Sequence, residues 1–252
     1  MNALVIGVRR QGKSTVSIAV AQSQSKTTVI FDPNEQFRNF PAIDVNAVEP
    51  ALVAAAEDQR GRHVIRVVPE GGEKEIQDSF GQLTDVLWGW EDLTLIIDEA
   101  STVQAPSIIH DNLNRILRRA HASFHTIQTS HRITDFHRLS RSVSLSDVFA
   151  FRTVQSGDIK RMGEEVDGRL VAILPTLGLY EVAHWWIRPG GDFAISVWRD
   201  PEEWYIDIGR DKGDQKNIDA TGEKETQERL FRPDGDTRSD DDPMLRRVKD
   251  AR

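Results

Sequence analysis

One eight-residue stretch near the start of the chain limits the possible folds more than any other feature. It reads Gly7-Val8-Arg9-Arg10-Gln11-Gly12-Lys13-Ser14 and matches the pattern Gly-x-x-x-x-Gly-Lys-Ser/Thr at every fixed position. An apolar run, 3–6, precedes it, and a helix-compatible run, 14–21, follows it. Strand, glycine-rich loop and helix in this order form an anion site, because loop N–H groups and the positive end of the helix converge there. The sequence therefore predicts an α/β fold that binds nucleotide phosphates after its first strand.

The residues of this loop have separate expected roles. Gly7 and Gly12 let the backbone curl so that successive N–H groups point at the β-phosphate. Lys13 is expected to bridge the β- and γ-phosphates, and the Ser14 hydroxyl to ligate Mg²⁺. The predicted ATP-binding residues are Gly7, Arg9, Arg10, Gln11, Gly12, Lys13, Ser14 and Thr15.

Short β-prone runs alternate with helical patterns along the chain. Strands are expected at 3–7, 27–31, 63–68, 93–98, 123–130 and 147–153, and helices at 13–22, 48–58, 73–88, 106–121 and 159–166. Most of the strand runs lack polar alternation, which is typical of a parallel sheet covered by helices on both faces. This order predicts a doubly wound α/β domain with a mostly parallel central sheet.

The pattern changes in the last third of the chain. Two β-prone segments, 179–187 and 193–199, flank the turn-rich stretch 189–192 and predict a β-hairpin at the sheet edge or beside it. The segment 211–252 contains twelve acidic and ten basic residues and few apolar ones, so burial cannot offset its ordering entropy. We therefore expect an ATPase domain over 1–208, hairpin included, and a charged, flexible tail over 209–252.

An acidic pair ends one of the predicted strands. The run 93–97 is mostly apolar and leads directly into Asp98 and Glu99. Asp98 is expected to hold Mg²⁺ through water, and Glu99 to polarise a water opposite the γ-phosphate, which suits hydrolysis rather than transfer to a bound acceptor. The alternative is that both acids begin a helix and interact with its dipole.

The composition excludes several classes of protein. The chain of 252 residues has no cysteine, which excludes disulfide frameworks, Cys-ligated zinc, iron–sulfur clusters and thiol catalysis. Its longest apolar run, 51–56, is far shorter than the ~18–20 residues of a membrane span. The formal net charge of −8 argues against a protein coated in positive charge for passive nucleic-acid binding.

Taken together, these motifs resemble the HerA–FtsK branch of P-loop ATPases, which includes viral genome-packaging ATPases. The stretch 27–34 resembles the family's second strand, which ends in Asp-Pro, and Asp98-Glu99-Ala100 resembles its acidic strand end. The stretch 118–132 resembles the family segment in which an arginine precedes a strand that ends in a polar sensor. The similarity spans roughly residues 1–155 and implies a P-loop NTPase fold of the RecA-like (ASCE) type.

The resemblance also implies roles for four further residues. Arg118 or Arg119, with Arg119 favoured, would enter the site of a neighbouring subunit and neutralise charge on the γ-phosphate. The alternative is that both arginines interact with the carbonyls and dipole at a helix end. Either Gln128 or His131 would be the sensor, and the sequence has Ala122-Ser123 where the family usually has a glycine.

A bare motor of this size most resembles the packaging ATPases of tailless, often membrane-containing viruses. We therefore expect a Mg²⁺-dependent ATPase that forms a homo-oligomeric ring, pentamer or hexamer, and translocates double-stranded DNA. It would act in the host cytoplasm or with the virion and contact a capsid, portal or membrane component without spanning a membrane. Two alternatives stay open: a small-molecule P-loop kinase, and an ATP-gated phage assembly or morphogenesis protein.

A local basic segment could hold DNA despite the acidic total. Residues 110–141 contain six arginines against two aspartates, together with five of the seven histidines. A ring motor needs few positive groups, because each subunit contributes a copy and phosphates are gripped without base readout. The alternative is an ordinary solvated helix face.

Overall fold

The computed structural model describes residues 1–58, 61–119, 123–142, 145–188 and 191–199. The chain divides into two units, Met1–Lys212 and Gly213–Arg252, and all described residues belong to the first. The predicted tail, 209–252, lies outside the described residues. Within the described part of the chain, no helix combines the length and the apolar character needed to cross a lipid bilayer.

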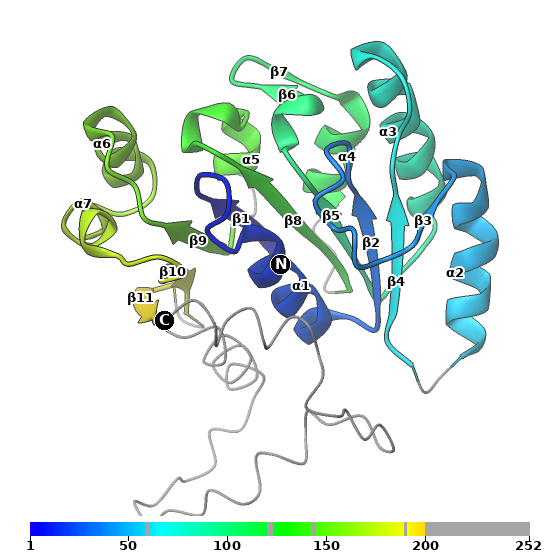
Figure 1. Cartoon of the computed structure of the whole chain (residues 1–252), viewed down its shortest axis with the longest axis horizontal. Coiled ribbons are helices and arrows are strands. Elements are labelled where there is room, and N and C mark those ends of the chain that lie inside the picture. Colours follow the sequence, from blue (N-terminus) through cyan, green and yellow to red (C-terminus); the bar gives the residue numbers. More distant parts are fainter. Residues whose placement is uncertain (59–60, 120–122, 143–144, 189–190, 200–252) are drawn as a thin grey trace, which may run out of the picture. The chain divides into compact units, whose positions relative to one another are not determined.

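A mixed sheet of nine strands forms the centre of the described unit (Figure 1). Its order is β11-β10-β9-β1-β8-β5-β2-β4-β3. The strands from β1 to β9 in this sheet pair in parallel, whereas β10 runs antiparallel to β9 and β11. The mostly parallel sheet and the hairpin at its edge confirm the predicted fold class. The strand bounds are β1 (Asn2–Ile6), β2 (Thr27–Phe31), β3 (Ala42–Ile43), β4 (His63–Val67), β5 (Leu93–Ile97), β8 (Phe124–Ser130), β9 (Asp147–Phe151), β10 (Val182–Ile187) and β11 (Phe193–Trp198).

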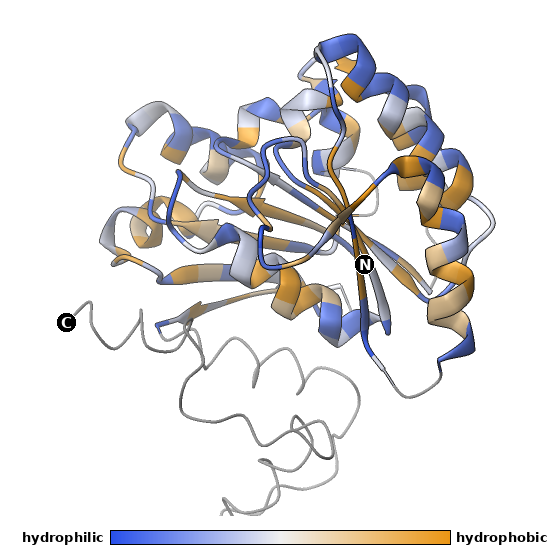
Figure 2. Ribbon diagram, turned by 45° about the vertical axis from the view of Figure 1, so that its right-hand side comes forward, coloured by the Kyte–Doolittle hydropathy of each residue, from blue (hydrophilic) through white to orange (hydrophobic). Residues whose placement is uncertain are grey.

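Helices cover both faces of this sheet, because neighbouring residues of each buried strand point to opposite faces. On one face, Leu4 and Ile6 join a large core with residues of α2, α3 and α4; on the other, Ala3 and Val5 pack with α1. Figure 2 shows the apolar residues of the strands and the inner helix faces gathered between the layers. The helices are α1 (Lys13–Gln24), α2 (Val48–Glu57), α3 (Glu73–Leu87), α4 (Asp111–Arg119), α5 (Arg138–Ser142), α6 (Ser156–Glu165) and α7 (Leu170–Ile173).

The structure differs from the sequence prediction at several element starts. The helix expected from 159 begins at Ser156. The helix expected from 106 begins at Asp111, and a small hairpin of β6 (Gln104–Ala105) and β7 (Ile108–Ile109) precedes it. Pro106 lies in the turn of this hairpin, where its fixed φ is favourable and its missing N–H costs nothing. The strand expected from 179 begins at Val182, because residues 178–181 form a turn.

The strand order determines which loops meet. The strand β8 lies between β1 and β5, so the loops that follow β1, β5, β8 and β2 emerge at one edge of the sheet. The antiparallel strand β10 starts at that same edge, which adds the turn before it. The helix α4 precedes β8 and therefore ends at the opposite edge.

Candidate active site

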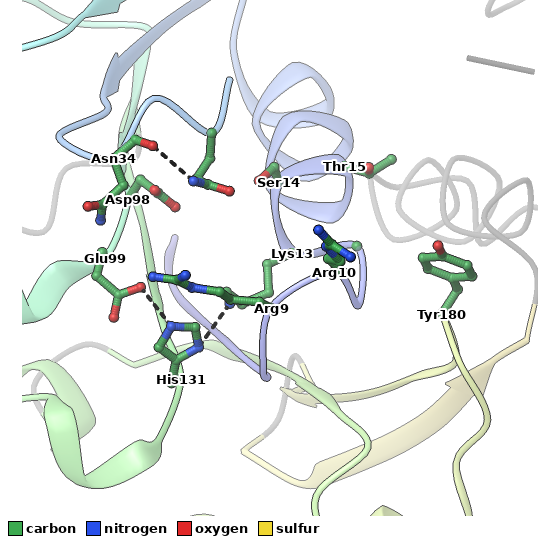
Figure 3. A pocket seen from close by; sticks show the side chains of 12 residues that line it. Arg9, Arg10, Lys13, Ser14, Thr15, Asn34, Asp98, Glu99, His131 and Tyr180 are labelled. Atoms are coloured by element: carbon green, nitrogen blue, oxygen red, sulfur yellow. Dashed lines mark hydrogen bonds and ion pairs between the residues drawn. The ribbon is translucent and has the colours of Figure 1, made fainter. Parts of the chain in front are cut away.

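A cavity of about 350 Å³ opens at the carboxyl edge of the parallel strands, beside the loop after β1 (Figure 3). Most of the predicted site residues line it. Those residues are Arg9, Arg10, Gly12, Lys13, Ser14, Thr15, Asp98, Glu99 and His131. Gly7, Gln11, Gln128 and Arg118 are not among its lining residues.

Both fixed glycines of the loop are required by its geometry. Gly12 has a φ of 100°, in the left-handed region that residues with a side chain rarely adopt. A Cβ on Gly7 would lie 2.8 Å from the Cβ of Phe151 on β9, closer than real contacts allow. Arg10 also has a positive φ, 66°. The loop therefore holds a strained curl that any residue other than glycine at position 7 or 12 would disturb.

The side chain of Gln11 stabilises the loop through hydrogen bonds and does not line the cavity. Its Oε1 accepts a hydrogen bond from Val8 N at 2.9 Å, and its Nε2 donates to the Arg152 carbonyl at 3.1 Å. The side chain is buried between β1 and β9 as a result. Any contact of Gln11 with a phosphate would thus come from its main chain.

The start of α1 is suited to an anion. Within the described residues, no side chain caps this helix end and its first turn carries no acid, so its first N–H groups face the cavity. Lys13 Nζ donates to the Gly7 carbonyl at 2.7 Å, which holds the ammonium over the loop. Burial lowers the pKa of Lys13 below its usual value, and the carboxylates of Glu99 and Asp98 oppose that shift.

The Thr129 hydroxyl joins the two acidic residues at the end of β5. It donates to Asp98 Oδ1 at 2.8 Å and accepts from Glu99 N at 3.0 Å. Glu99 has a φ of 47°, so the chain turns sharply after Asp98 and brings the second carboxylate into the cavity. Burial raises the pKa of Asp98 to about 6, with further raising by Asp32 and Glu99. The site therefore contains one carboxyl that is costly to ionise until a cation is present.

His131 connects the phosphate loop with Glu99. Its Nε2 lies 3.4 Å from Glu99 Oε2, and its Nδ1 lies 3.2 Å from the Gly7 carbonyl oxygen and 3.4 Å from Lys13 Nζ. Asp135 fixes this position, because its carboxylate accepts hydrogen bonds from Ser130 Oγ and Arg132 N, on either side of His131. Of the two predicted sensor residues, His131 is the one at the cavity.

Gln128 lies in the interior of the domain. Its Oε1 accepts a hydrogen bond from Gln104 Nε2 at 2.7 Å, and its own Nε2 donates to Asn2 Oδ1 at 3.3 Å. Gln128 pairs with Ile97 in the sheet, one residue before the level of Asp98. Because side chains alternate along a strand, the β8 residue that faces Asp98 is Thr129 and not Gln128.

Asp32 supports the site from the end of β2. It forms a buried ion pair with Arg66, with 2.6 Å between Oδ2 and Nε. Its oxygens also accept hydrogen bonds from Gln36 N and Phe37 N. The loop after β2 is thereby held against the sheet, and Asn34 and Gln36 line the cavity.

The sequence analysis did not single out Thr129, Asn34, Gln36 or Tyr180. The polar residues at the end of β8 could have indicated Thr129, because β8 ends beside β5, the strand that leads into Asp98 and Glu99. Asn34 and Gln36 follow the Asp-Pro pair of β2 and could have been found there. Tyr180 reaches the cavity from the turn before β10, and only the antiparallel direction of that strand explains it.

The predicted arginines of 110–141 make separate contacts with different partners. Arg118 is exposed on α4, and its Nε donates to Asn114 Oδ1 at 2.7 Å. Arg115 lies 4.5 Å from the centre of the Trp88 ring. Arg132 and Arg141 form ion pairs with Asp158 and Glu165. The side chain of Arg119 and residues 120–122 lie outside the described part of the chain.

The donor set fits Mg²⁺. The Ser14 hydroxyl and the Asp98 carboxylate both line the cavity, and oxygen donors are the ligands that Mg²⁺ prefers. Among the described residues, no group of three or more His, Asp and Glu side chains could hold a metal ion by itself.

The raised pKa of Asp98 predicts a pH-dependent gain in stability when its charge is removed. The folded carboxyl binds a proton more tightly than the unfolded one, so its contribution to stability is full below pH ~4 and is lost as pH rises through ~6. Asp98→Asn should therefore raise the free energy of unfolding by up to about 3 kcal/mol at pH 8, without metal or nucleotide, and change it little at pH 4. Urea unfolding at both pH values measures this.

Asp167→Asn is a control of opposite sign for that experiment. The hydrogen bond from Arg169 lowers the pKa of Asp167 to about 2, so this carboxylate stabilises the fold at neutral pH. Its removal should lower stability at pH 8. An effect of Asp98→Asn that is equal at pH 4 and pH 8 would contradict the assignment of a buried, proton-binding carboxyl.

Comparison with solved structures shows that the fold is that of P-loop NTPases. The genome packaging NTPase B204 from Sulfolobus turreted icosahedral virus 2, solved with AMPPCP, has a TM-score of 0.58 at 15% identity, over 77% of this chain and 95% of that one. B204 from Sulfolobus turreted icosahedral virus, described as a DNA-packaging ATPase, has a TM-score of 0.56 at 16% identity, over 77% and 98%. Neither protein-family models nor curated proteins give a match. The described unit therefore shares its architecture with these viral packaging NTPases at low sequence identity.

Proposed function

We propose that this chain is a Mg²⁺-dependent ATPase that translocates double-stranded DNA as a ring oligomer and packages a viral genome in the host cytoplasm. One observation supports hydrolysis most directly: His131 lies 3.4 Å from both Lys13 Nζ and Glu99 Oε2, so a phosphate-binding ammonium and a carboxylate face one another across the same cavity. A γ-phosphate held by Lys13 would have Glu99 on its far side, where an attacking water must lie.

Each group of the site has a step in this proposal. The curled loop and the start of α1 hold the phosphates through N–H groups, and Lys13 adds positive charge at the β- and γ-phosphates. Mg²⁺, held by Ser14 and Asp98, would neutralise charge on the phosphate oxygens. Glu99 takes a proton from the attacking water, and His131 positions Glu99 by lying between its carboxylate and the Lys13 ammonium.

Arg119 cannot complete its own site in this fold. Its helix ends at the amino edge of the sheet, and the seven residues of β8 separate that edge from the cavity. At about 3.3 Å per residue the separation is on the order of 20 Å, beyond the reach of an arginine side chain. If Arg119 takes part in hydrolysis, it must therefore do so at the site of another copy of the chain, which agrees with the proposed ring.

The DNA substrate is proposed from the architecture together with the charge distribution. Proteins of this architecture include genome packaging NTPases of two related viruses. Arg132 and Arg141 are each paired with an acid, which reduces the positive charge that this segment of one subunit offers to DNA. Arginines that recur around a ring would instead enclose phosphates from several subunits, which is compatible with the net charge of −8.

Glu99→Gln should separate binding from hydrolysis. The amide cannot accept the proton of the attacking water, so turnover should fall at least about 100-fold while ATP affinity changes little. Phosphate release and equilibrium ATP binding measure the two effects. Glu164→Gln makes the same chemical change on exposed α6 and should alter neither. Unchanged turnover in Glu99→Gln would remove Glu99 from this role.

Mixed assemblies should show whether Arg119 acts between subunits. Lys13→Ala and Arg119→Ala proteins should each be inactive, but a 1:1 mixture restores intact sites wherever an Arg119→Ala site meets the arginine of a Lys13→Ala neighbour. Random mixing in a ring then gives about a quarter of the wild-type rate. Lys13→Ala mixed with Glu99→Gln should stay inactive. Each of these changes disables the site of the subunit that carries it, so no subunit in the mixture has an intact site. No rescue at any ratio would count against an arginine acting in trans.

Long duplex DNA should stimulate the ATPase rate. The stimulation should weaken steeply between about 50 and 200 mM salt, because phosphate contacts release counterions. Phosphate release with and without DNA at several salt concentrations is the measurement. An ATPase rate that ignores DNA, together with phosphoryl transfer to a nucleoside or sugar, would replace the motor with a small-molecule kinase.

A further inference from the structure

An exposed tyrosine stands at the end of the cavity opposite Glu99. Tyr180 is a lining residue of the cavity, and 40% of its surface is exposed. Figure 3 shows Glu99 and His131 at one end of the row of labelled side chains, Lys13 in the middle, and Thr15 followed by Tyr180 at the other end. In the proposed function the γ-phosphate lies at Glu99, so the nucleoside end of a bound triphosphate would face Tyr180.

The turn that carries Tyr180 is rigid. Glu181 Oε2 accepts a hydrogen bond from Gly178 N at 2.8 Å, which closes the turn with a side chain. The residues on both sides of it, Leu177 and Val182, are buried in the domain. The backbone that carries the ring is therefore held in place on both sides of Tyr180.

The backbone at Tyr180 has a positive φ, as it does at Arg10 and Glu99 in the same cavity. Its φ is 66°, at a turn position where glycine or asparagine is ordinarily found. Strain of this kind persists where the surrounding structure enforces it, and it gathers at ligand sites. A smaller residue would satisfy the turn better, so the bulky aromatic ring has no local structural advantage.

We propose that Tyr180 is the stacking platform for the base of the nucleotide, an inference that rests on the proposed function of this cavity. Aromatic rings stack on the π-face that every base presents, without reading its hydrogen-bonding edge. Asn34, an amide that could read such an edge, lies beside Asp98 at the other end of the cavity (Figure 3). Recognition by stacking alone would admit nucleoside triphosphates in general, so the site should accept GTP nearly as well as ATP.

The test compares ligands with and without a base. Tyr180→Gly removes the ring and suits the positive φ, so the melting temperature should not fall. Its Kd for ATP and GTP with Mg²⁺ should rise about tenfold, which corresponds to about 1.4 kcal/mol, while its Kd for inorganic tripolyphosphate stays the same. Tyr180→Phe keeps the ring and should bind all three ligands like the wild type. Isothermal titration calorimetry measures each Kd.

Leu179→Gly is the matched control, because Leu179 is exposed on the same turn but does not line the cavity. It should bind every ligand like the wild type. If Tyr180→Gly weakens ATP and tripolyphosphate equally, or neither, Tyr180 is not a base platform. If the wild-type chain binds no tripolyphosphate, the phosphate site and the proposed ATPase function fail first, and the Tyr180 proposal fails with them.

Discussion

The site depends on the pairing of β8 with both β1 and β5. In this register Thr129 lies beside Asp98, and Ser130 lies beside Ile6, the last residue before the phosphate loop. One hydroxyl can then bond the Asp98 carboxylate and the Glu99 amide, while the next residues bring His131 over the loop. A slip of β8 by one residue would exchange its two faces, placing Gln128 at the acids and the apolar Ile127 where Gln128 now bonds Gln104 and Asn2.

This constraint explains which parts of the site follow from the sequence. The phosphate loop is local: its glycines, its lysine and its flanking strand and helix are contiguous, so the pattern alone predicts their arrangement. Asp98 and Glu99 follow from an apolar run that ends in acids. By contrast, the choice between Gln128 and His131 depends on which face of β8 meets β5, and that is a property of strand pairing over 30 residues of separation.

The fold shows the same division between local and non-local information. Strands of five or more residues and helices of ten or more residues were predicted, because their patterns are long. The hairpin before α4 was not, since its two-residue strands carry no periodicity and Pro106 is also common at helix starts. Tyr180 is the extreme case, because nothing in the residues around it indicates that an antiparallel strand returns this turn to the phosphate-binding edge.

The cavity is arranged for a charged ligand before the ligand binds, and this arrangement lowers the stability of the free folded protein. Three residues other than glycine that line the cavity have positive φ angles, namely Arg10, Glu99 and Tyr180. The same cavity contains an ammonium with a lowered pKa and a carboxyl with a raised one, both shifted first by burial. Each of these features opposes folding of the free protein, and each is relieved or used when a polyanion and a divalent cation enter. A structural role alone would favour relaxed turns and neutral side chains here, so their retention together at one edge of the sheet is best explained by binding of a charged ligand.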